Sequence, residues 1–263
     1  MVTLTDQLGK IITLTKPPER IISLVPSQTE LLYYLGLDKE IAGITKFCIH
    51  PAHKTTAKLK IGGTKQLNIP LIKSLNPDLI IANKEENERV QLEELMNAYP
   101  TYVSDPHNLD TALGMINDIG ALTGLKQRAG ELSVAIRHQF NYLSTMQPVN
   151  FSVAYLIWRK PYMVAGKNTF IDDMLNRCGF NNVFSQNRYP GVNNDMLIEA
   201  KPHVVLLSSE PYPFKQKHLD EFAALLPDSI VKLVDGEMFS WYGSRLLYAA
   251  EYFIKLIDSI KQV

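Results

Sequence analysis

The feature that most constrains the fold of this chain is an internal repeat. Residues 68–82 and 193–207 share the same order of an asparagine, two apolar positions, a proline and an apolar run, 125 residues apart in a chain of 263. Each copy predicts a short helix that ends before its proline, Pro77 or Pro202, and is followed by a buried strand. A duplication at about half the chain length predicts two similar α/β lobes. Ligands commonly bind in the cleft between such lobes.

Composition sets the class of protein. The hydrophobic content of 46% is enough for a packed core. Lys and Arg together number 27, as do Asp and Glu, so the formal net charge is zero. This balance gives no indication of a nucleic-acid or membrane-surface partner. No apolar run approaches the length of a membrane-spanning helix, so none is predicted.

Strand and helix patterns alternate in both halves of the chain. Strands are predicted at 20–25, 41–44, 79–82 and 99–103 in the first half, and at 151–157, 204–207 and 230–234 in the second. Helices are predicted at 27–37 (capped by Ser27 or Thr29), 86–98, 108–123, 169–178, 218–226 and 243–260. This alternation is typical of parallel sheets covered on both faces.

One long helix is predicted between the two copies of the repeat. Apolar residues recur at spacings of three and four over 124–147, and Pro148 ends the pattern. We interpret this segment as a rigid helix that connects the lobes. The expected domains are therefore 1–123, the connecting helix 124–147, and 148–263.

The N-terminal segment and the cysteines bear on location. Residues 1–20 are polar and β-like, and they lack the basic region followed by an apolar run that marks a signal peptide. The protein is therefore expected either to be cytosolic or to be a processed chain. Cys48 and Cys178 fall in different lobes and are expected to remain unpaired.

Three segments resemble a known family. Residues 20–51 (RIISLVPSQTELLYYLGLDKEIAGITKFCIHP), 61–82 and 164–184 are similar to the helical-backbone (class III) substrate-binding proteins of ABC importers, which carry cobalamin, haem and ferric siderophores. Within that family the chain is most similar to the cobalamin receptors, over nearly its whole length. The resemblance implies two Rossmann-like lobes with parallel sheets joined by one long helix. It also implies ligand capture in the cleft without catalysis or a resident cofactor, action as a monomer, and a periplasmic or cell-envelope location.

The resemblance also identifies permease-docking positions. In the cobalamin receptors one carboxylate on each lobe docks onto arginines of the permease. The matching positions here are Pro70 and Asp195, which are also equivalent in the internal repeat. Pro70 carries no charge, so Glu85, Glu86 or Glu88 nearby is expected to replace it. Asp195 and Glu86 are therefore the predicted docking residues.

Candidate ligand contacts in the second lobe follow two strands. Trp158 and Arg159 come directly after the strand at 151–157, and ligands gather at the carboxyl ends of parallel strands. An indole and a guanidinium suit a planar or anionic chelate. The resemblance places Trp241, Tyr242 and Arg245 in the cleft, with Arg245 bracing the loop. The alternatives are that the aromatic residues form a satellite hydrophobic cluster and that Arg159 is solvated.

The first lobe contributes a more polar set. Phe47 matches an aromatic cleft position of the cobalamin receptors, and Lys65 follows the Gly62–Gly63 pair. Thr64 and Asn83 stand where those receptors have tryptophans, so this side of the cleft is expected to be less aromatic. The glycine pair is too short for a phosphate-binding loop and predicts a tight turn.

The leading hypothesis is therefore a binding protein that captures a metal chelate, either cobalamin, a ferric siderophore or haem, for ABC-type import. The first alternative is a cytosolic chelatase-like enzyme, for which His50, His107 and Glu210 are the candidate proton acceptors. A soluble carrier or sensor on the same fold is the second. Cys48, His50 and His53 lack a visible fourth ligand, so no metal site is predicted. The chain has no nucleophile elbow, P-loop or zinc-protease motif that would favour an enzyme.

Overall fold

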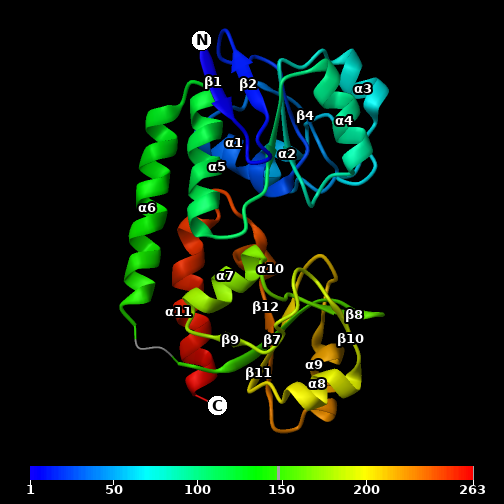
Figure 1. The fold of residues 1–263 in the computed structure, drawn as a ribbon, viewed down its shortest axis with the longest axis vertical. Helices are drawn as coiled ribbons and strands as arrows, with labels where there is room; N and C mark the ends of the chain where they lie inside the picture. The colour runs from blue at the N-terminus through cyan, green and yellow to red at the C-terminus, as the bar shows by residue number, and fades with distance from the viewer. Residues whose placement is uncertain (147–148, 263) are drawn as a thin grey trace. The chain divides into compact units, whose positions relative to one another are not determined.

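The computed structural model describes residues 1–146 and 149–262, and these form two compact units (Figure 1). Unit 1 comprises Met1–Pro106, Asp110–Ala135 and Tyr242–Arg245. Unit 2 comprises His107–Leu109, Ile136–Trp241 and the chain from Leu246 onward. The predicted α/β class with parallel sheets is confirmed in both units.

Unit 1 is built on a four-stranded parallel sheet in the order β4-β3-β5-β6. Its strands are β3 (Ile21–Ser23), β4 (Ile41–Ile44), β5 (Leu79–Asn83) and β6 (Thr101–Ser104), preceded by an antiparallel hairpin of β1 (Val2–Thr5) and β2 (Ile11–Leu14). The helices are α1 (Pro26–Leu35), α2 (Ala52–Thr55), α3 (Ile69–Ser74), α4 (Arg89–Ala98) and α5 (Leu109–Leu122). Every residue of β3, β5 and β6 is buried, as expected for parallel strands covered on both faces.

Two predicted helix starts in unit 1 are wrong. Helix α1 begins at Pro26, and neither Ser27 nor Thr29 caps it. The Thr29 hydroxyl lies instead 2.8 Å from the carbonyl oxygen of Val25 and 2.7 Å from Ser23 Oγ. Proline at the first helical position needs no N–H partner. Helix α4 begins at Arg89 rather than at residue 86. Asn83 Oδ1 accepts the backbone N–H groups of the next two glutamates and holds them in a loop.

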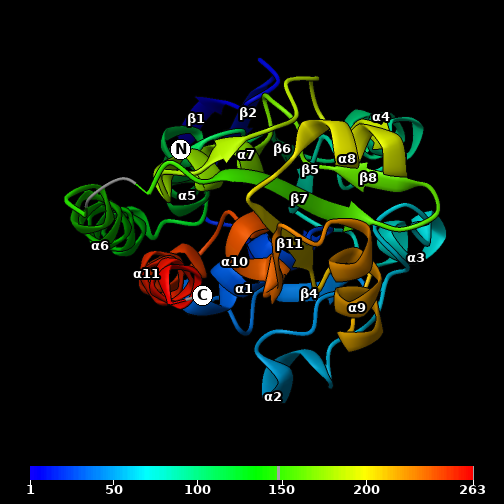
Figure 2. The same cartoon turned by 90° about the horizontal axis from the view of Figure 1, so that it is seen from below.

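Unit 2 has a six-stranded mixed sheet in the order β10-β8-β7-β11-β12, with β9 pairing β7. The strands are β7 (Ser152–Trp158), β8 (Tyr162–Val164), β9 (Asn181–Asn182), β10 (Gly191–Val192), β11 (Val204–Ser208) and β12 (Ile230–Val234). The helices are α7 (Phe170–Arg177), α8 (Asn194–Ala200), α9 (Gln216–Leu225), α10 (Gly236–Ser240) and α11 (Leu246–Lys261). Strands β7 and β11 run parallel and side by side (Figure 2), whereas β8 and β10 add an antiparallel edge that the sequence did not predict.

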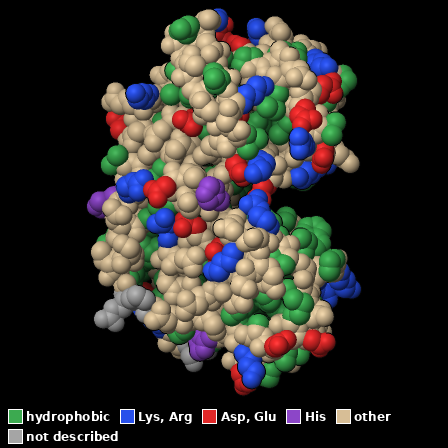
Figure 3. Space-filling view, viewed as in Figure 1, with side chains coloured by type: hydrophobic (Ala, Val, Ile, Leu, Met, Phe, Trp, Pro, Cys, Tyr) green, Lys and Arg blue, Asp and Glu red, His purple; other side chains and the backbone are tan. Residues whose placement is uncertain are grey.

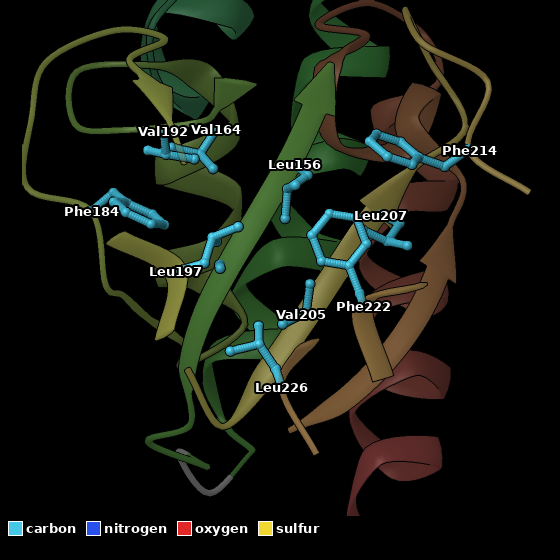
Figure 4. Packing of buried hydrophobic residues seen from close by; sticks show 11 residues of the cluster. Leu156, Val164, Phe184, Val192, Leu197, Val205, Leu207, Phe214, Phe222 and Leu226 are labelled. Carbon is cyan, nitrogen blue, oxygen red and sulfur yellow. The ribbon is translucent and has the colours of Figure 1, made fainter. Parts of the chain in front are cut away.

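The core of unit 2 is an apolar cluster on this sheet. Leu156 on β7, Leu207 on β11 and Phe222 on α9 are among its buried members (Figure 4). The last predicted helix, 243–260, is correct only from Leu246. The separate short helix α10 precedes it, with Asp235 as its N-cap.

Helix α6 (Lys126–Ser144) is the predicted long helix. Its residues up to Ala135 belong to unit 1 and those from Ile136 to unit 2. Gly124 separates it from α5 with a φ of 75°, a left-handed conformation that glycine adopts without strain. The predicted end at Gln147 and the stop at Pro148 lie outside the described residues. The predicted domain limits 1–123, 124–147 and 148–263 stay a prediction.

The sequence repeat is also a repeat of backbone structure. The Asn68 side chain caps α3 by accepting the N–H of Leu71, and Asn193 caps α8 in the same way from Met196. Asn76 and Lys201, at equivalent positions after these helices, both have a φ of 44°. Each half therefore uses one N-cap and one left-handed residue to deliver the chain into a buried strand.

We predict that Lys201→Gly stabilises the protein. Lys201 is exposed and left-handed, a conformation that costs a residue with a side chain about 1–2 kcal/mol. Glycine removes this cost but adds entropy to the unfolded chain, so the expected gain in free energy of unfolding is about 0.5–1 kcal/mol. Urea denaturation measures it. Asn76→Gly is the matched control with a smaller gain, because asparagine tolerates this conformation. An equal gain at both positions would contradict the argument.

A buried tyrosine and two carboxylates link β6, α5 and the hairpin of unit 1. The Tyr102 hydroxyl donates to Asp118 Oδ2 at 2.9 Å, and Asp6 Oδ2 accepts the N–H of Val103 at 3.2 Å. Burial raises the pKa of Asp118, the Asp6 charge raises it further, and the hydrogen bond from Tyr102 only partly opposes them. The folded state therefore disfavours the ionised form of Asp118.

We expect this carboxyl to make stability depend on pH. Because its folded pKa is raised, its stabilising contribution is complete below the ordinary value of 3.8 and is lost as pH rises through the folded pKa. Asp118→Asn keeps an acceptor for Tyr102, so it is expected to be more stable than wild type at pH 7, with the difference vanishing in acid. Asp118→Ala leaves the buried hydroxyl without this acceptor and is expected to lose about 1–3 kcal/mol. Urea denaturation from acid to neutral pH tests both. A difference for the asparagine variant that does not change with pH would refute the assignment.

Candidate functional site

The carboxyl ends of the unit 1 strands meet in a buried polar network. Asn83, at the end of β5, donates from Nδ2 to the carbonyl and the hydroxyl of Ser104 at the end of β6, at 3.0 and 3.1 Å. Gln28 on α1 also donates to Ser104 Oγ. Asn83 is only 2% exposed, so its side chain shapes the loop that follows β5. Its predicted contact with a ligand is untested.

Exposed side chains stand on the loops around this network. Phe47, three residues after the end of β4, is 50% exposed, and Lys46 Nζ lies 5.1 Å from the centre of its ring. Lys65 is exposed, and its Nζ donates to the carbonyl of Glu85 at 2.5 Å. The structure therefore connects the Lys65 loop to the loop after β5, which also carries the exposed Glu86.

The Gly62–Gly63 pair forms the predicted tight turn. Gly62 has a φ of 107°, and a Cβ atom there would lie 2.4 Å from the carbonyl oxygen of Gln66. Gly63 N–H donates to that same carbonyl at 2.8 Å. Only glycine fits Gly62, and the turn places Lys65 at its exposed tip.

The segment Tyr242–Arg245 is anchored to α1 within unit 1. Arg245 forms a two-pronged ion pair with Glu30, with Nη2–Oε1 at 2.6 Å and Nε–Oε2 at 3.1 Å. A Cβ on Gly243 would lie 2.7 Å from the carbonyl oxygen of Ser27, so the backbones approach closely. Arg245 braces this loop, and Tyr242 is 8% exposed.

In unit 2, Trp158 ends β7 and is 39% exposed. Arg159 follows it and forms a two-pronged ion pair with Glu221 on α9, with Nη2–Oε2 at 2.8 Å and Nε–Oε1 at 3.3 Å. The Arg159 side chain is 23% exposed. Arg159 is therefore paired with a carboxylate and partly exposed. Whether its guanidinium also binds a ligand stays a prediction.

The Glu210 carboxylate anchors the Trp241 side chain. Its Nε1–H donates to Glu210 Oε1 at 2.9 Å, and the Ser240 hydroxyl donates to the same oxygen at 2.6 Å. A Cβ on Gly236 would lie 2.7 Å from Glu210 Cγ, so α10 packs tightly over this residue. With an exposure of 6%, Trp241 presents little surface of its own.

The predicted docking positions occupy equivalent places in the two units. Pro70 and Asp195 both lie in the first turn of their helices, α3 and α8, and both are exposed. Their chemistry differs as predicted, because only Asp195 carries a charge.

The Cys48 thiol is part of the unit 1 interior. It is 1% exposed and lies 3.1 Å from the hydroxyls of both Thr29 and Thr45. Burial raises the pKa of Cys48, and these hydrogen bonds only partly oppose the rise. Cys48 and Cys178 are both free, as predicted. Within residues 1–146 and 149–262, no three His, Cys, Asp or Glu side chains are grouped to hold a metal ion.

Sequence reasoning missed the partners of these residues. Glu30 and Glu221 lie on helices far along the chain from the arginines they hold, and no local pattern distinguishes them from solvated charges. The helical spacing of His218 and Glu221 was the only available signal, since residues three apart share a helix face.

The distribution of surface charge does not indicate a type of binding partner. In the face seen in Figure 3, basic and acidic side chains are interspersed among the described residues. None of the described helices combines the length and apolar character needed to cross a membrane.

Known proteins resemble this chain over most of its length. A vitamin B12-binding protein of Yersinia pestis (strain Pestoides F) is 25% identical over 253 residues, covering 92% of this chain and 87% of the relative. The periplasmic vitamin B12 binding protein BtuF of Vibrio cholerae has a TM-score of 0.81 at 21% identity, covering 94% of this chain and 99% of that one.

Other solved structures share the fold. The periplasmic heme-binding protein RhuT from Roseiflexus sp. RS-1 has a TM-score of 0.79 at 21% identity, covering 93% of this chain and 98% of that one. Residues 21–225 match the family described as periplasmic binding protein, which is more than half of the sequence. The chain therefore belongs to the periplasmic binding protein family.

Proposed function

We propose that this protein captures a metal chelate and delivers it to the permease of an ABC importer. The observation that carries the proposal is the family match over residues 21–225, together with relatives that bind vitamin B12 or heme. A further relative is described as an ABC-type Fe³⁺-hydroxamate transport system from Saccharomonospora viridis, with a TM-score of 0.76 at 20% identity. The cargo is therefore cobalamin, haem or a ferric siderophore.

The exposed residues at the strand ends are the proposed contacts. Trp158 in unit 2 and Phe47 in unit 1 each leave a large part of an aromatic ring accessible. Such rings bind the faces of large conjugated ligands through apolar contact and stacking. Lys65 supplies an exposed ammonium group, and an anionic substituent of a chelate is the natural partner for it.

The more buried residues of the predicted set have a different proposed role. Asn83, Tyr242 and Trp241 are at most 8% exposed, and Arg245 is committed to Glu30. We assign them to shaping and holding the loops, because a side chain without accessible surface gains little from ligand contact. Pre-formed loops lower the entropy cost of binding.

Asp195, with Glu86 in place of Pro70, is the proposed docking pair for a permease. Both carboxylates are exposed. Exposed charges act mainly by steering partners and fixing their register.

The enzyme alternative is not favoured by the family or by its relatives. Its candidate base Glu210 already accepts hydrogen bonds from Ser240 and Trp241. A general base needs to reach the proton that it removes, so a carboxylate held in this way suits an anchoring role.

We expect Trp158→Ala and Phe47→Ala each to weaken chelate binding by about tenfold, the loss typical of an aromatic contact residue. Equilibrium dialysis against cyanocobalamin, haem and a ferric hydroxamate measures the dissociation constants without relying on tryptophan emission. Tyr142→Ala is the control, because Tyr142 is an aromatic residue of α6 with 59% exposure and no proposed contact. Binding of none of the three chelates at micromolar concentration would disprove the function. Binding that neither variant weakens would disprove the site.

A further inference from the structure

Helix α9 directs two polar side chains toward the end of β7. His218 and Glu221 are three residues apart and therefore share a helix face. His218 is 2% exposed, although it is a titratable residue. The neighbouring Phe222 lies in the apolar cluster and fixes the helix against β7 and β11 (Figure 4). The helix that carries these two polar side chains is therefore fixed by its packing in the core.

Glu221 makes the first of two sets of contacts with the end of β7. One carboxylate accepts two N–H groups of Arg159 and the hydroxyl of Tyr162 on β8. Burial alone would raise the pKa of Glu221, but the hydrogen bonds from Tyr162 and Arg159 outweigh it and lower that pKa. The ionised carboxylate thus holds the residue that follows Trp158 and a residue on the next strand.

His218 makes the second set of contacts, through Tyr212. Its Nδ1 accepts the N–H of Lys215 at 2.8 Å, so the neutral ring carries its proton on Nε2, which lies 3.3 Å from the Tyr212 hydroxyl. The Tyr212 ring meets the Trp158 indole edge-on, with centroids 5.8 Å apart. The N–H of Tyr212 also donates to the carbonyl of Ile157 at 3.3 Å. Tyr212 is therefore held against the end of β7 from two sides.

We propose that Glu221 and His218 are positioning residues that hold the Trp158 indole as a platform for an uncharged conjugated or apolar face of the ligand. In this assignment Arg159 belongs to the brace and does not bind a ligand anion. The inference rests on the proposed function, since it takes Trp158 to be a contact residue. Its physical basis is that the Nε–H and one Nη2–H of Arg159 donate to the Glu221 carboxylate, which pairs the charge of the guanidinium and fixes its orientation.

The first test measures Trp158 alone. In a Trp241→Phe background Trp158 is the only tryptophan, and acrylamide quenching reports how accessible and mobile it is. Glu221→Gln and Arg159→Gln are each expected to raise the quenching constant by about 1.5- to 2-fold, and the double variant no further, because the pair acts as a unit. Tyr212→Phe, which removes only the hydroxyl that faces His218, is expected to act in the same direction.

The matched control is Asp220→Asn. Asp220 is the exposed neighbour of Glu221 on the same helix, so this change removes the same charge without touching Arg159. It is expected to leave quenching unchanged. Unchanged quenching in both Glu221→Gln and Arg159→Gln, with the fold intact by circular dichroism, would overturn the proposal that Glu221 positions Trp158.

The second test separates a brace from an anion contact. With Trp241 retained, dissociation constants are measured for haem, which carries carboxylates, and for cyanocobalamin. The brace predicts that Glu221→Gln and Arg159→Gln both weaken binding of the chelate that wild type takes, by about fivefold and with a non-additive double variant. An Arg159 that binds ligand carboxylates would instead give opposite signs for haem: tighter binding in Glu221→Gln and weaker binding in Arg159→Gln. That result would overturn the proposal.

The two tests fail independently. If wild type binds no chelate, the proposed function is wrong, while the quenching measurement still decides whether α9 holds Trp158. If chelates bind but the quenching constants do not change, the function stands and the positioning role is wrong.

Discussion

Burial of the parallel strands on both faces is the constraint on which the rest of this structure depends. The residues of β5 and β11 are buried throughout, so neither strand can carry chemistry along its length. Polar residues appear only where the strands end, as Asn83 and Ser208 do at equivalent positions of the repeat. Function is therefore confined to the loops that leave the carboxyl ends, as is usual for sheets of this kind.

Within those loops, exposure divides the aromatic residues into two kinds. Trp158 and Phe47 keep accessible rings, whereas Trp241 and Tyr242 are buried, and the Trp241 indole N–H donates to Glu210. Buried polar groups need partners because an unpaired donor or acceptor loses its hydration without compensation. The carboxylates Glu210, Glu221 and Glu30 meet this need in three separate places, and each fixes a loop residue as it does so.

Much of the fold could be predicted because its signals are local. The short helices of the repeat, the prolines that follow them and the apolar strand runs are patterns of a few residues, and the structure has each of them. The failures have a common cause. Thr29 was predicted as an N-cap by a local rule, but its hydroxyl meets Ser23 on β3. The start of α4 was predicted too early, because the Asn83 side chain that shapes the preceding loop is itself held by Ser104 on β6. The antiparallel strands β8 and β10 are too short to give a periodic signal.

The sequence by itself determined the α/β class, the two related halves, the long helix between them and the family. These follow from hydrophobic period and turn chemistry, which act over neighbouring residues. Only the tertiary structure decided which candidate residues are accessible and which are braces. Arg159 and Arg245 look alike in sequence as loop cations, yet both are paired with carboxylates more than 60 residues away in the chain. Such pairing depends on the packing of distant elements, and no local pattern encodes it.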